Sequence, residues 1–388
     1  MIEFLSPVSK KVIAHKEVLP EGVLGKKIET HTNLGELPDL KNVKFAILGI
    51  LENRNDVDYI GETISLDAFR KALYSLYPGN WSQTIIDIGN INKGETVQDT
   101  FFAVKTVVEA LLKRDIIPLI LGGSQDLLYA HYRAYDSHGS MINLANVDTR
   151  FDLGDAEKPI NNKSFVGKII IDKPYNLFNY SLLGYQSYFN APEEIALMEK
   201  LYFDAYRLGE VTQDISVVEP ILRDADIVAL DISAIKNAEM SYNNITSPNG
   251  FDGREICAIS RYAGISNRVS SFGVYELKDF KNAKIGAMLV AQILWYFIEG
   301  VNFRVQEGEF DDEKKYTTYK VPIDDDEVLT FKKSNKTGRW WIELPFISGV
   351  NNKLKTPTLL PCTYGDYLSA TNQEIPERWF KARRKNEV

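Results

Sequence analysis

Three short polar clusters contain the residues best suited to chemistry: GGSQD (122–126), DTRFD (148–152) and DIS (231–233). Each follows an apolar run that is typical of a strand buried on both faces. The glycines of the first cluster permit a tight turn and a close approach of the backbone. Asp148, Asp152 and Asp231 supply the oxygen ligands that hard cations prefer. Because ligand sites of parallel sheets form beyond the carboxyl ends of strands, we expect the clusters to share one site.

Histidine is scarce in this chain, which limits the chemistry open to it. Four histidines exist, at positions 15, 31, 131 and 138, and any site that needs several imidazoles must draw on them. We expect His131 and His138 to lie in the core or on the surface. Ser124, Asp126 and His131 contain the residue types of a nucleophilic triad, but no G-x-S-x-G elbow surrounds the serine, so we disfavour that interpretation.

Composition indicates a folded protein without a general affinity for nucleic acid. The 388 residues are 44% hydrophobic and 11% aromatic, and the net charge is -8. The two cysteines, Cys257 and Cys362, are too few for a disulfide framework and fit a reducing compartment. The N-terminus lacks the pattern of a secretory signal. The longest apolar segment, 285–298, contains Gln292 and falls short of the about 20 residues that span a bilayer. We expect a cytoplasmic protein that does not enter a membrane.

Apolar runs and helical periodicities alternate along the middle of the chain, which predicts a mostly parallel sheet covered on both faces. The expected strands are 43–50, 84–91, 116–121, 141–148, 175–185, 225–233 and 268–276. The expected helices are 66–77, 95–115, 127–135, 192–209, 253–264 and 283–300. We divide the chain into an irregular N-terminal arm (1–40), a main α/β domain (41–300) and a C-terminal extension (301–388).

The C-terminal extension has a different character. Its segments 315–323, 326–334 and 339–346 predict short strands separated by the turn-like sequences IDDDE and SNKTG. The closing WFKARRK is a basic cluster, and we expect it to be a solvated end. Trp340, Trp341 and Trp379 could anchor a protein partner, since aromatic residues dominate interface cores, or pack against the body of the protein.

Taken together, the motifs resemble the ureohydrolase superfamily, which includes arginase, agmatinase and formiminoglutamase. The family pattern is G-G-x-H, then D-A-H-x-D, then D-x-D. Its formiminoglutamase branch is the most similar, through GGSQDLLYAHYRAY, NVDTRFDL, FNYSLLGYQSYFN, the TSPNGF stretch and SSFGVYE with Glu276. This resemblance covers roughly residues 40–300 and implies a three-layer α/β/α arginase-like fold with a mostly parallel sheet.

The resemblance also implies where a metal site would lie. In the family, two histidines and four aspartates at these motifs hold two manganese ions. The matching positions here are Gln125, Asp148, Arg150, Asp152, Asp231 and Ser233. Three of the six ligands are therefore replaced, and at position 150 the replacement is a permanent cation.

These replacements predict a loss of catalysis. Bridging metals lower the pKa of water from 15.7 toward roughly 7 and so produce the attacking hydroxide. We expect no metal cofactor, with Arg150 in the space of a metal and paired with Asp148, Asp152 or Asp231. The expected role is binding or scaffolding, with a protein partner on the extension or as a homo-oligomer.

Two alternatives stay open. The chain could be an active, manganese-dependent hydrolase of C–N bonds in linear amidines, with an altered metal site, or could hold a weak Mg²⁺ or Ca²⁺ ion at Asp148, Asp152 and Asp231. Glu276 matches the family acid that grips the cationic end of the substrate, although it could also face water or pair with Arg150. Lys236 adds a positive charge near the expected mouth of the site.

Overall fold

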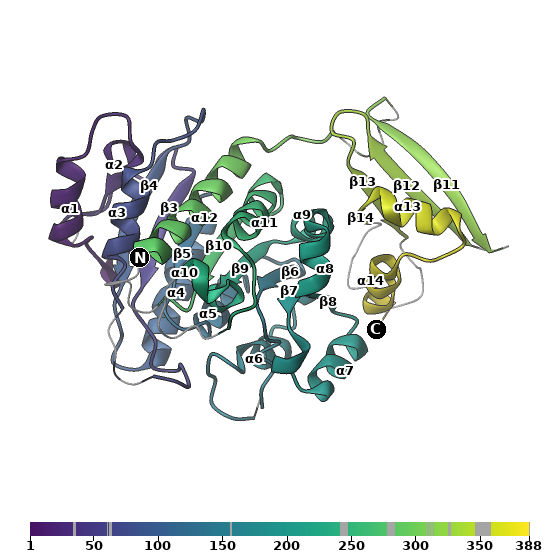
Figure 1. Cartoon of the computed structure of the whole chain (residues 1–388), viewed down its shortest axis with the longest axis horizontal. Coiled ribbons are helices and arrows are strands. Elements are labelled where there is room, and N and C mark those ends of the chain that lie inside the picture. The colour runs from purple at the N-terminus through teal and green to yellow at the C-terminus, as the bar shows by residue number, and fades with distance from the viewer. Residues whose placement is uncertain are drawn as a thin grey trace.

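The computed structural model contains two sheets, a large one in the main domain and a small one in the C-terminal extension (Figure 1). The structure describes residues 1–33, 36–59, 61, 64–155, 157–240, 247–277, 284–308, 310, 312, 314–324, 327–345 and 358–387. Thr246 of the TSPNGF stretch and residues 325–326 of IDDDE lie outside these ranges.

The large sheet has ten strands in the order β1-β4-β3-β5-β10-β9-β6-β7-β8, and β2 also pairs with β4. Its strands are β1 (Leu5–Ser6), β2 (Glu29–Thr30), β3 (Phe45–Ile50), β4 (Ile85–Ile91), β5 (Ile117–Leu121), β6 (Ile142–Val147), β7 (Leu177–Tyr185), β8 (Asp204–Arg207), β9 (Ile227–Asp231) and β10 (Ser271–Tyr275). All pairs are parallel except β1 with β4. The predicted mostly parallel sheet is confirmed.

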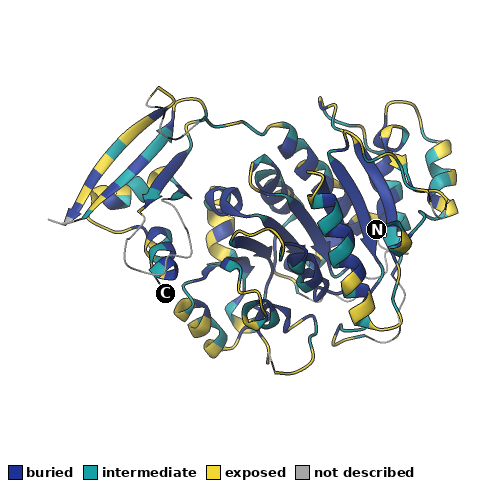
Figure 2. Ribbon diagram, turned by 180° about the vertical axis from the view of Figure 1, so that it is seen from behind, coloured by how far each residue is buried: buried dark blue, intermediate teal, exposed yellow. Residues whose placement is uncertain are grey.

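Helices cover both faces of this sheet because its central strands are buried on both of their faces. In β3, Phe45 and Ile47 join one hydrophobic cluster, whereas Ala46 and Leu48 join another. The first cluster contains α3 (Asp67–Ser75), α11 (Gly253–Ile265) and α12 (Lys284–Asn302), and the second contains α4 (Val97–Leu112), α5 (Leu127–Arg133) and α6 (Phe165–Ile171). Figure 2 shows the buried strands between these layers, which confirms the three-layer α/β/α arrangement.

Helix α12 is long and apolar enough, by length and composition alone, to cross a membrane. In this structure 61% of its apolar window is buried, and it packs against α11 and α3. A core helix of this kind has the same composition as a membrane span.

The first forty residues are not the irregular arm that we predicted. They contain the 3-10 helix η1 (Ile2–Phe4), α1 (Lys10–Glu17) and α2 (Leu24–Lys27) besides the two short strands. Strands β1 and β2 both pair with β4, and Val12 and Leu24 are buried in the core. These elements are too short to show a periodicity in the sequence, so only tertiary contacts reveal them.

The predicted helix over 192–209 is also wrong. Helix α7 ends at Lys200 (Pro192–Lys200), and Tyr202 then adopts a left-handed φ of 56°. The chain continues as the edge strand β8 and α8 (Leu208–Gln213). Further short helices of the described chain were not predicted either, among them α6, η2 (Ser187–Phe189), η3 (Ile215–Val217), α9 (Val218–Asp224) and α10 (Asn237–Met240).

The C-terminal extension forms an antiparallel sheet of four strands, of which three were predicted. These are β11 (Tyr316–Asp324), β12 (Glu327–Ser334), β13 (Trp340–Leu344) and β14 (Thr358–Cys362), followed by α13 (Tyr364–Thr371) and α14 (Glu377–Glu387). The basic WFKARRK segment is not a solvated end, because it forms most of α14. Within it Lys385 is 6% exposed and donates a hydrogen bond to Asn179 of β7.

The three tryptophans of the extension are buried, which supports internal packing rather than direct contact with a partner. Trp340, Trp341 and Trp379 are 7%, 5% and 2% exposed. The indole of Trp379 donates to the carbonyl of Glu343 at 2.8 Å, and the guanidinium of Arg223 from α9 lies 4.4 Å from the Trp341 ring. A partner of the extension would have to contact other residues.

Candidate functional site

The GGSQD loop follows β5 and turns sharply into α5. A Cβ atom at Gly123 would lie 1.9 Å from the carbonyl oxygen of Glu52, so only glycine fits there. The turn buries Gln125, whose side-chain amide donates to the Asn146 side chain at 3.2 Å. The backbone N–H of Gln125 donates to Glu276 at 2.9 Å. The loop is thus fixed by residues at the carboxyl ends of β6 and β10.

The DTRFD loop follows β6 and turns its first aspartate inward. One oxygen of Asp148 accepts hydrogen bonds from the backbone N–H groups of Thr149 and Arg150, and the other accepts one from the Asn146 side chain at 3.2 Å. Asp152 is 5% exposed and has a left-handed φ of 50°. Such a conformation is sparsely populated for a residue with a side chain and tends to occur at functional sites.

Asp231 ends β9 and begins the 3-10 helix η4 (Ile232–Ala234). Its carboxylate accepts the backbone N–H of Ser233 at 2.6 Å, as a helix-capping side chain does. Parallel pairing of β9 with β6 places this aspartate beside the DTRFD loop. The structure therefore brings Gln125, Asp148, Asp152, Asp231 and Ser233 to neighbouring strand ends, as the motifs predict.

Burial raises the pKa of all three aspartates, and neighbouring negative charges add to this effect at Asp152 and Asp231. Burial raises the pKa of Asp148 above that of an exposed aspartate. Burial, followed by the charges of Asp148 and Asp231, raises the pKa of Asp152 well above its ordinary value. Burial and the charges of Asp148 and Glu276 do the same for the pKa of Asp231. Carboxyl groups crowded in this way cannot all ionise without a compensating cation.

Arg150 does not supply that cation by direct contact. Its guanidinium donates to the carbonyl of Phe189 at 2.8 Å and lies 4.6 Å from the Phe189 ring. Among the described residues it forms no ion pair with Asp148, Asp152 or Asp231, so the predicted pairing is wrong. The positive charge lowers the pKa of Asp152 only as the weakest of several influences, of which burial is the largest. Arg150 is half-buried in this position, whereas a guanidinium buried among the aspartates would carry a large desolvation cost.

Glu276 follows β10 and faces the GGSQD loop. It has a left-handed φ of 62°, and its carboxylate accepts hydrogen bonds from the Gln125 backbone at 2.9 Å and from the Asn162 side chain at 3.1 Å. Asn162 was not predicted to belong to the site, since no motif marks it. Glu276 therefore organises the loop, and the predicted pairing with Arg150 does not occur among the described residues.

The residue types of a nucleophilic triad are present but are not arranged as one. Ser124 donates a hydrogen bond to Asp126, whereas His131 contacts the Tyr275 hydroxyl at 2.8 Å and the Ser271 hydroxyl at 2.6 Å. Burial raises the pKa of Asp126 to about 7 and lowers the pKa of His131 to about 3. His131 is a neutral core residue, as one of the two interpretations predicted.

The donor set does not suit the two manganese ions of the resemblance. A guanidinium has no lone pair to offer a metal, and Gln125 and Ser233 offer only neutral oxygens. Across the described ranges, no group of three or more His, Cys, Asp or Glu side chains is arranged to hold a metal ion. The carboxylates of Asp148 and Asp231 already accept hydrogen bonds from backbone and amide N–H groups. The residues present therefore do not fit a bimetallic centre.

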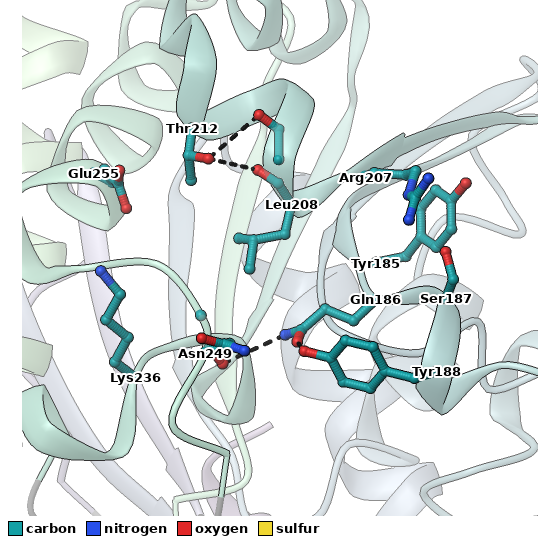
Figure 3. A pocket seen from close by; sticks show the side chains of 12 residues that line it. Tyr185, Gln186, Ser187, Tyr188, Arg207, Leu208, Thr212, Lys236, Asn249 and Glu255 are labelled. Atoms are coloured by element: carbon teal, nitrogen blue, oxygen red, sulfur yellow. Dashed lines mark hydrogen bonds between the residues drawn. The ribbon is translucent and has the colours of Figure 1, made fainter.

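A pocket of about 490 Å³ opens beside these loops, at the carboxyl ends of β7 and β8 (Figure 3). It is lined by Tyr185, Gln186, Ser187, Tyr188, Arg207, Leu208, Gly209, Thr212, Lys236, Asn249, Gly250 and Glu255. Of these, only Lys236 was predicted to lie near the mouth of the site. Arg207, Leu208, Gly209 and Thr212 come from the β8–α8 segment, which the sequence did not reveal.

Comparison with known proteins gives consistent results. The family model described as the arginase family matches residues 45–299. A formimidoylglutamase of Ralstonia nicotianae is 25% identical over 268 residues, which are 63% of this chain and 81% of the relative. A formimidoylglutamase of Corynebacterium efficiens is 24% identical over 290 residues, which are 68% of this chain and 88% of that protein.

Solved structures share the fold of this chain. The formiminoglutamase of Trypanosoma cruzi with Mn²⁺ superposes with a TM-score of 0.63 at 15% identity, covering 70% of this chain and 97% of that one. The formimidoylglutamase of Bacillus subtilis gives a TM-score of 0.61 at 16% identity and covers 69% and 90% of the two chains. The family match spans more than half of the sequence, and the sheet order, the loop positions and the neighbouring structures agree with it. This chain belongs to the arginase family and is similar to formiminoglutamases.

Proposed function

We propose that this arginase-family chain has lost the dimanganese centre and its hydrolytic activity, and acts as a binding protein. The observation that carries the proposal is the residue at position 150 and its contacts. An arginine stands where the family motif has a metal-binding histidine, and its guanidinium is held against Phe189. A guanidinium stays protonated in proteins and cannot coordinate a metal ion.

The other replaced positions support the same conclusion. The side-chain amide of Gln125 donates a hydrogen bond to the Asn146 side chain, and the backbone N–H of Ser233 donates one to the Asp231 carboxylate. Bridging metals would supply a hydroxide nucleophile, since they lower the pKa of bound water to roughly 7. Without them, the described residues do not assemble a Ser-His-Asp triad, because Ser124 donates to Asp126 whereas His131 contacts the hydroxyls of Tyr275 and Ser271.

The loops nevertheless retain an ordered geometry. Asp152 and Glu276 both hold left-handed conformations, which cost of order 1–3 kcal/mol each and persist only when the surroundings enforce them. A site that keeps such conformations beside a pocket is suited to bind a ligand. This supports binding over a purely structural role for the loops.

Metal content and turnover together test the proposal. The full chain is purified with added manganese, dialysed and measured by elemental analysis. It is then assayed with formiminoglutamate, arginine and agmatine, with and without a chelator. We expect substoichiometric manganese and no chelator-sensitive turnover. Stoichiometric manganese with chelator-sensitive hydrolysis of any of these amidines would overturn the proposal in favour of an active hydrolase.

A further inference from the structure

The pocket beside the degenerate loops is of the size that small-molecule sites have, about 490 Å³. Separate segments build it: the end of β7 with the residues that follow it, the β8–α8 junction, Lys236 after η4, Asn249 and Gly250 before α11, and the first turn of α11. It includes none of the six positions that match the family's metal ligands. A ligand can therefore bind in this pocket whether or not a metal ion is bound at those six positions.

Two cationic side chains line this pocket without a partner. Arg207 is exposed and Lys236 is partly exposed. In the part of the chain that the structure describes, neither guanidinium nor ammonium group forms a hydrogen bond or an ion pair. Figure 3 shows them on opposite sides of the pocket, Arg207 next to Tyr185 and Lys236 across from it. The whole chain has a net charge of -8. Two unpaired cations in one pocket therefore make this region locally positive on a protein that is negative overall, which favours a negatively charged ligand.

The acid in the lining, Glu255, forms no ion pair with either cation among the described residues. Glu255 accepts the backbone N–H of Asp252 at 2.8 Å, as part of the capping box of α11. It forms no ion pair with Lys236 within the described ranges. The lining therefore keeps an excess of one positive charge.

Neutral polar groups form the wall between the two cations. Tyr188 donates a hydrogen bond to the side-chain oxygen of Gln186, and the Gln186 amide donates to the carbonyl of Asn249 at 3.4 Å. This chain of contacts fixes the wall and orients its amide and hydroxyl groups. The Ser187 hydroxyl lies on the Arg207 side of the pocket (Figure 3).

We propose that this pocket binds a small organic dianion with an acidic group at each end, one contacting Arg207 and the other Lys236. The planar fork of Arg207 suits a carboxylate, and Lys236 supplies a point charge. The polar wall suits an uncharged but hydrogen-bonding middle. The proposal rests on the proposed function in that the chain binds a ligand here, but it does not require that hydrolysis has been lost.

The experiment uses glutarate as the probe, with the full chain in EDTA at low ionic strength. Calorimetric titration should show saturable binding of glutarate and much weaker binding of butyrate, which carries one charge. Arg207→Gln and Lys236→Gln should each weaken glutarate binding by about tenfold or more, the effect of losing one charge-assisted hydrogen bond. Lys11→Gln, at an exposed lysine far along the chain, is the matched control and should bind as the wild type does.

Three results would overturn the proposal: no saturable binding of glutarate by folded wild type, equal affinities for glutarate and butyrate, or unchanged affinity in both pocket variants. Binding of inorganic phosphate without binding of glutarate would also overturn it, because that would indicate a single compact anion. Since EDTA removes metals, these outcomes are independent of the manganese and turnover measurements. Failure of the pocket and failure of the proposed loss of hydrolysis are thereby distinguishable.

Discussion

The guanidinium of Arg150 donates a hydrogen bond to the backbone carbonyl of Phe189 at 2.8 Å and lies 4.6 Å from the centre of the Phe189 ring. The side chain of Asn190 reinforces this contact, because it accepts the backbone N–H of Phe151 at 2.8 Å and donates to the carbonyl of Thr149. The loop after β6 is thus joined to the loop after β7, which carries Gln186 and Tyr188 of the pocket. Arg150 has become a structural link between the degenerate site and the pocket.

Rebuilding the family ligands should restore metal affinity. We expect the triple variant Gln125→His, Arg150→His, Ser233→Asp to bind manganese, because it returns two imidazoles and a carboxylate to the three remaining aspartates. Elemental analysis after dialysis measures the gain, and circular dichroism verifies the fold. The single variant Arg150→His is the control and should stay low in metal. A folded triple variant that gains no manganese would contradict the assignment of the six positions.

The buried ion pair between Arg70 and Asp87 should be essential for stability. Arg70 contacts both carboxylate oxygens of Asp87, at 2.8 and 3.1 Å, and the two side chains are 1% and 0% exposed. Removing one partner leaves an unpaired buried charge, so we expect Arg70→Met to lower the free energy of unfolding by about 3–5 kcal/mol in urea titrations.

Its matched control is an exposed pair. Lys113 and Glu109 are 65% and 25% exposed, and Lys113→Met should change the free energy of unfolding by less than about 1 kcal/mol. Equal effects of the two substitutions would contradict the view that burial gives the Arg70 pair its importance.

His131 should make the fold sensitive to acid. Burial lowers the pKa of His131 in the native state to about 3, whereas the unfolded chain takes up the proton near 6.5. Between these values the unfolded state binds more protons, so stability falls as the pH drops below 6.5, by roughly 1.4 kcal/mol per pH unit from this residue. At pH 7 and above, the contribution is fully present.

Urea unfolding at pH 7 and pH 5 measures this effect. We expect His131→Gln to be less stable than the wild type at pH 7, with the difference shrinking by roughly 2 kcal/mol at pH 5. His138→Gln, at an exposed histidine, serves as the control. A difference that stays constant with pH would show that His131 is not kept neutral in the fold.

Arg223 should hold the C-terminal extension against the main domain. Its guanidinium donates to the carbonyls of Trp340 at 3.0 Å and Cys362 at 3.2 Å, and it lies over the Trp341 ring. Arg223→Met should therefore speed chymotryptic cleavage within the extension, measured by mass spectrometry, and raise the solvent quenching of tryptophan fluorescence. Arg384→Met changes an exposed arginine of α14 and should leave both readouts unchanged. Wild-type cleavage rates for Arg223→Met would argue that other contacts hold the extension.

The sequence predicted the main domain well because its strands and helices are long and strongly patterned. It failed where an element is short or is defined by distant contacts. The edge strand β8 has four residues, and Asp204 within it is held by the Asn179 side chain of β7. The sequence of helix α14 predicts a solvated basic cluster. In the structure Arg378 of this helix forms ion pairs with Asp204 and Asp224, which are distant in the sequence and could not be identified as its partners.

The positions of the site were predictable, but the direction of one side chain was not. The motifs place Gln125, Asp148, Asp152 and Asp231 at neighbouring strand ends, and the structure has them there. The rotamer of Arg150 depends on Phe189, which lies 39 residues along the chain, and on the cost of burying a guanidinium among aspartates. The pocket was missed for a similar reason, since Arg207 belongs to the unpredicted β8.

Helix α14 has a further consequence through its place beside β8. An edge strand offers unpaired backbone groups that another chain can extend. Here β8 is short, and Lys385 and Arg378 from α14 are drawn to Asp204 on that strand, together with Asn179 on its neighbour. We therefore expect α14 to hinder the pairing of β8 with a strand of another chain at this end of the main sheet.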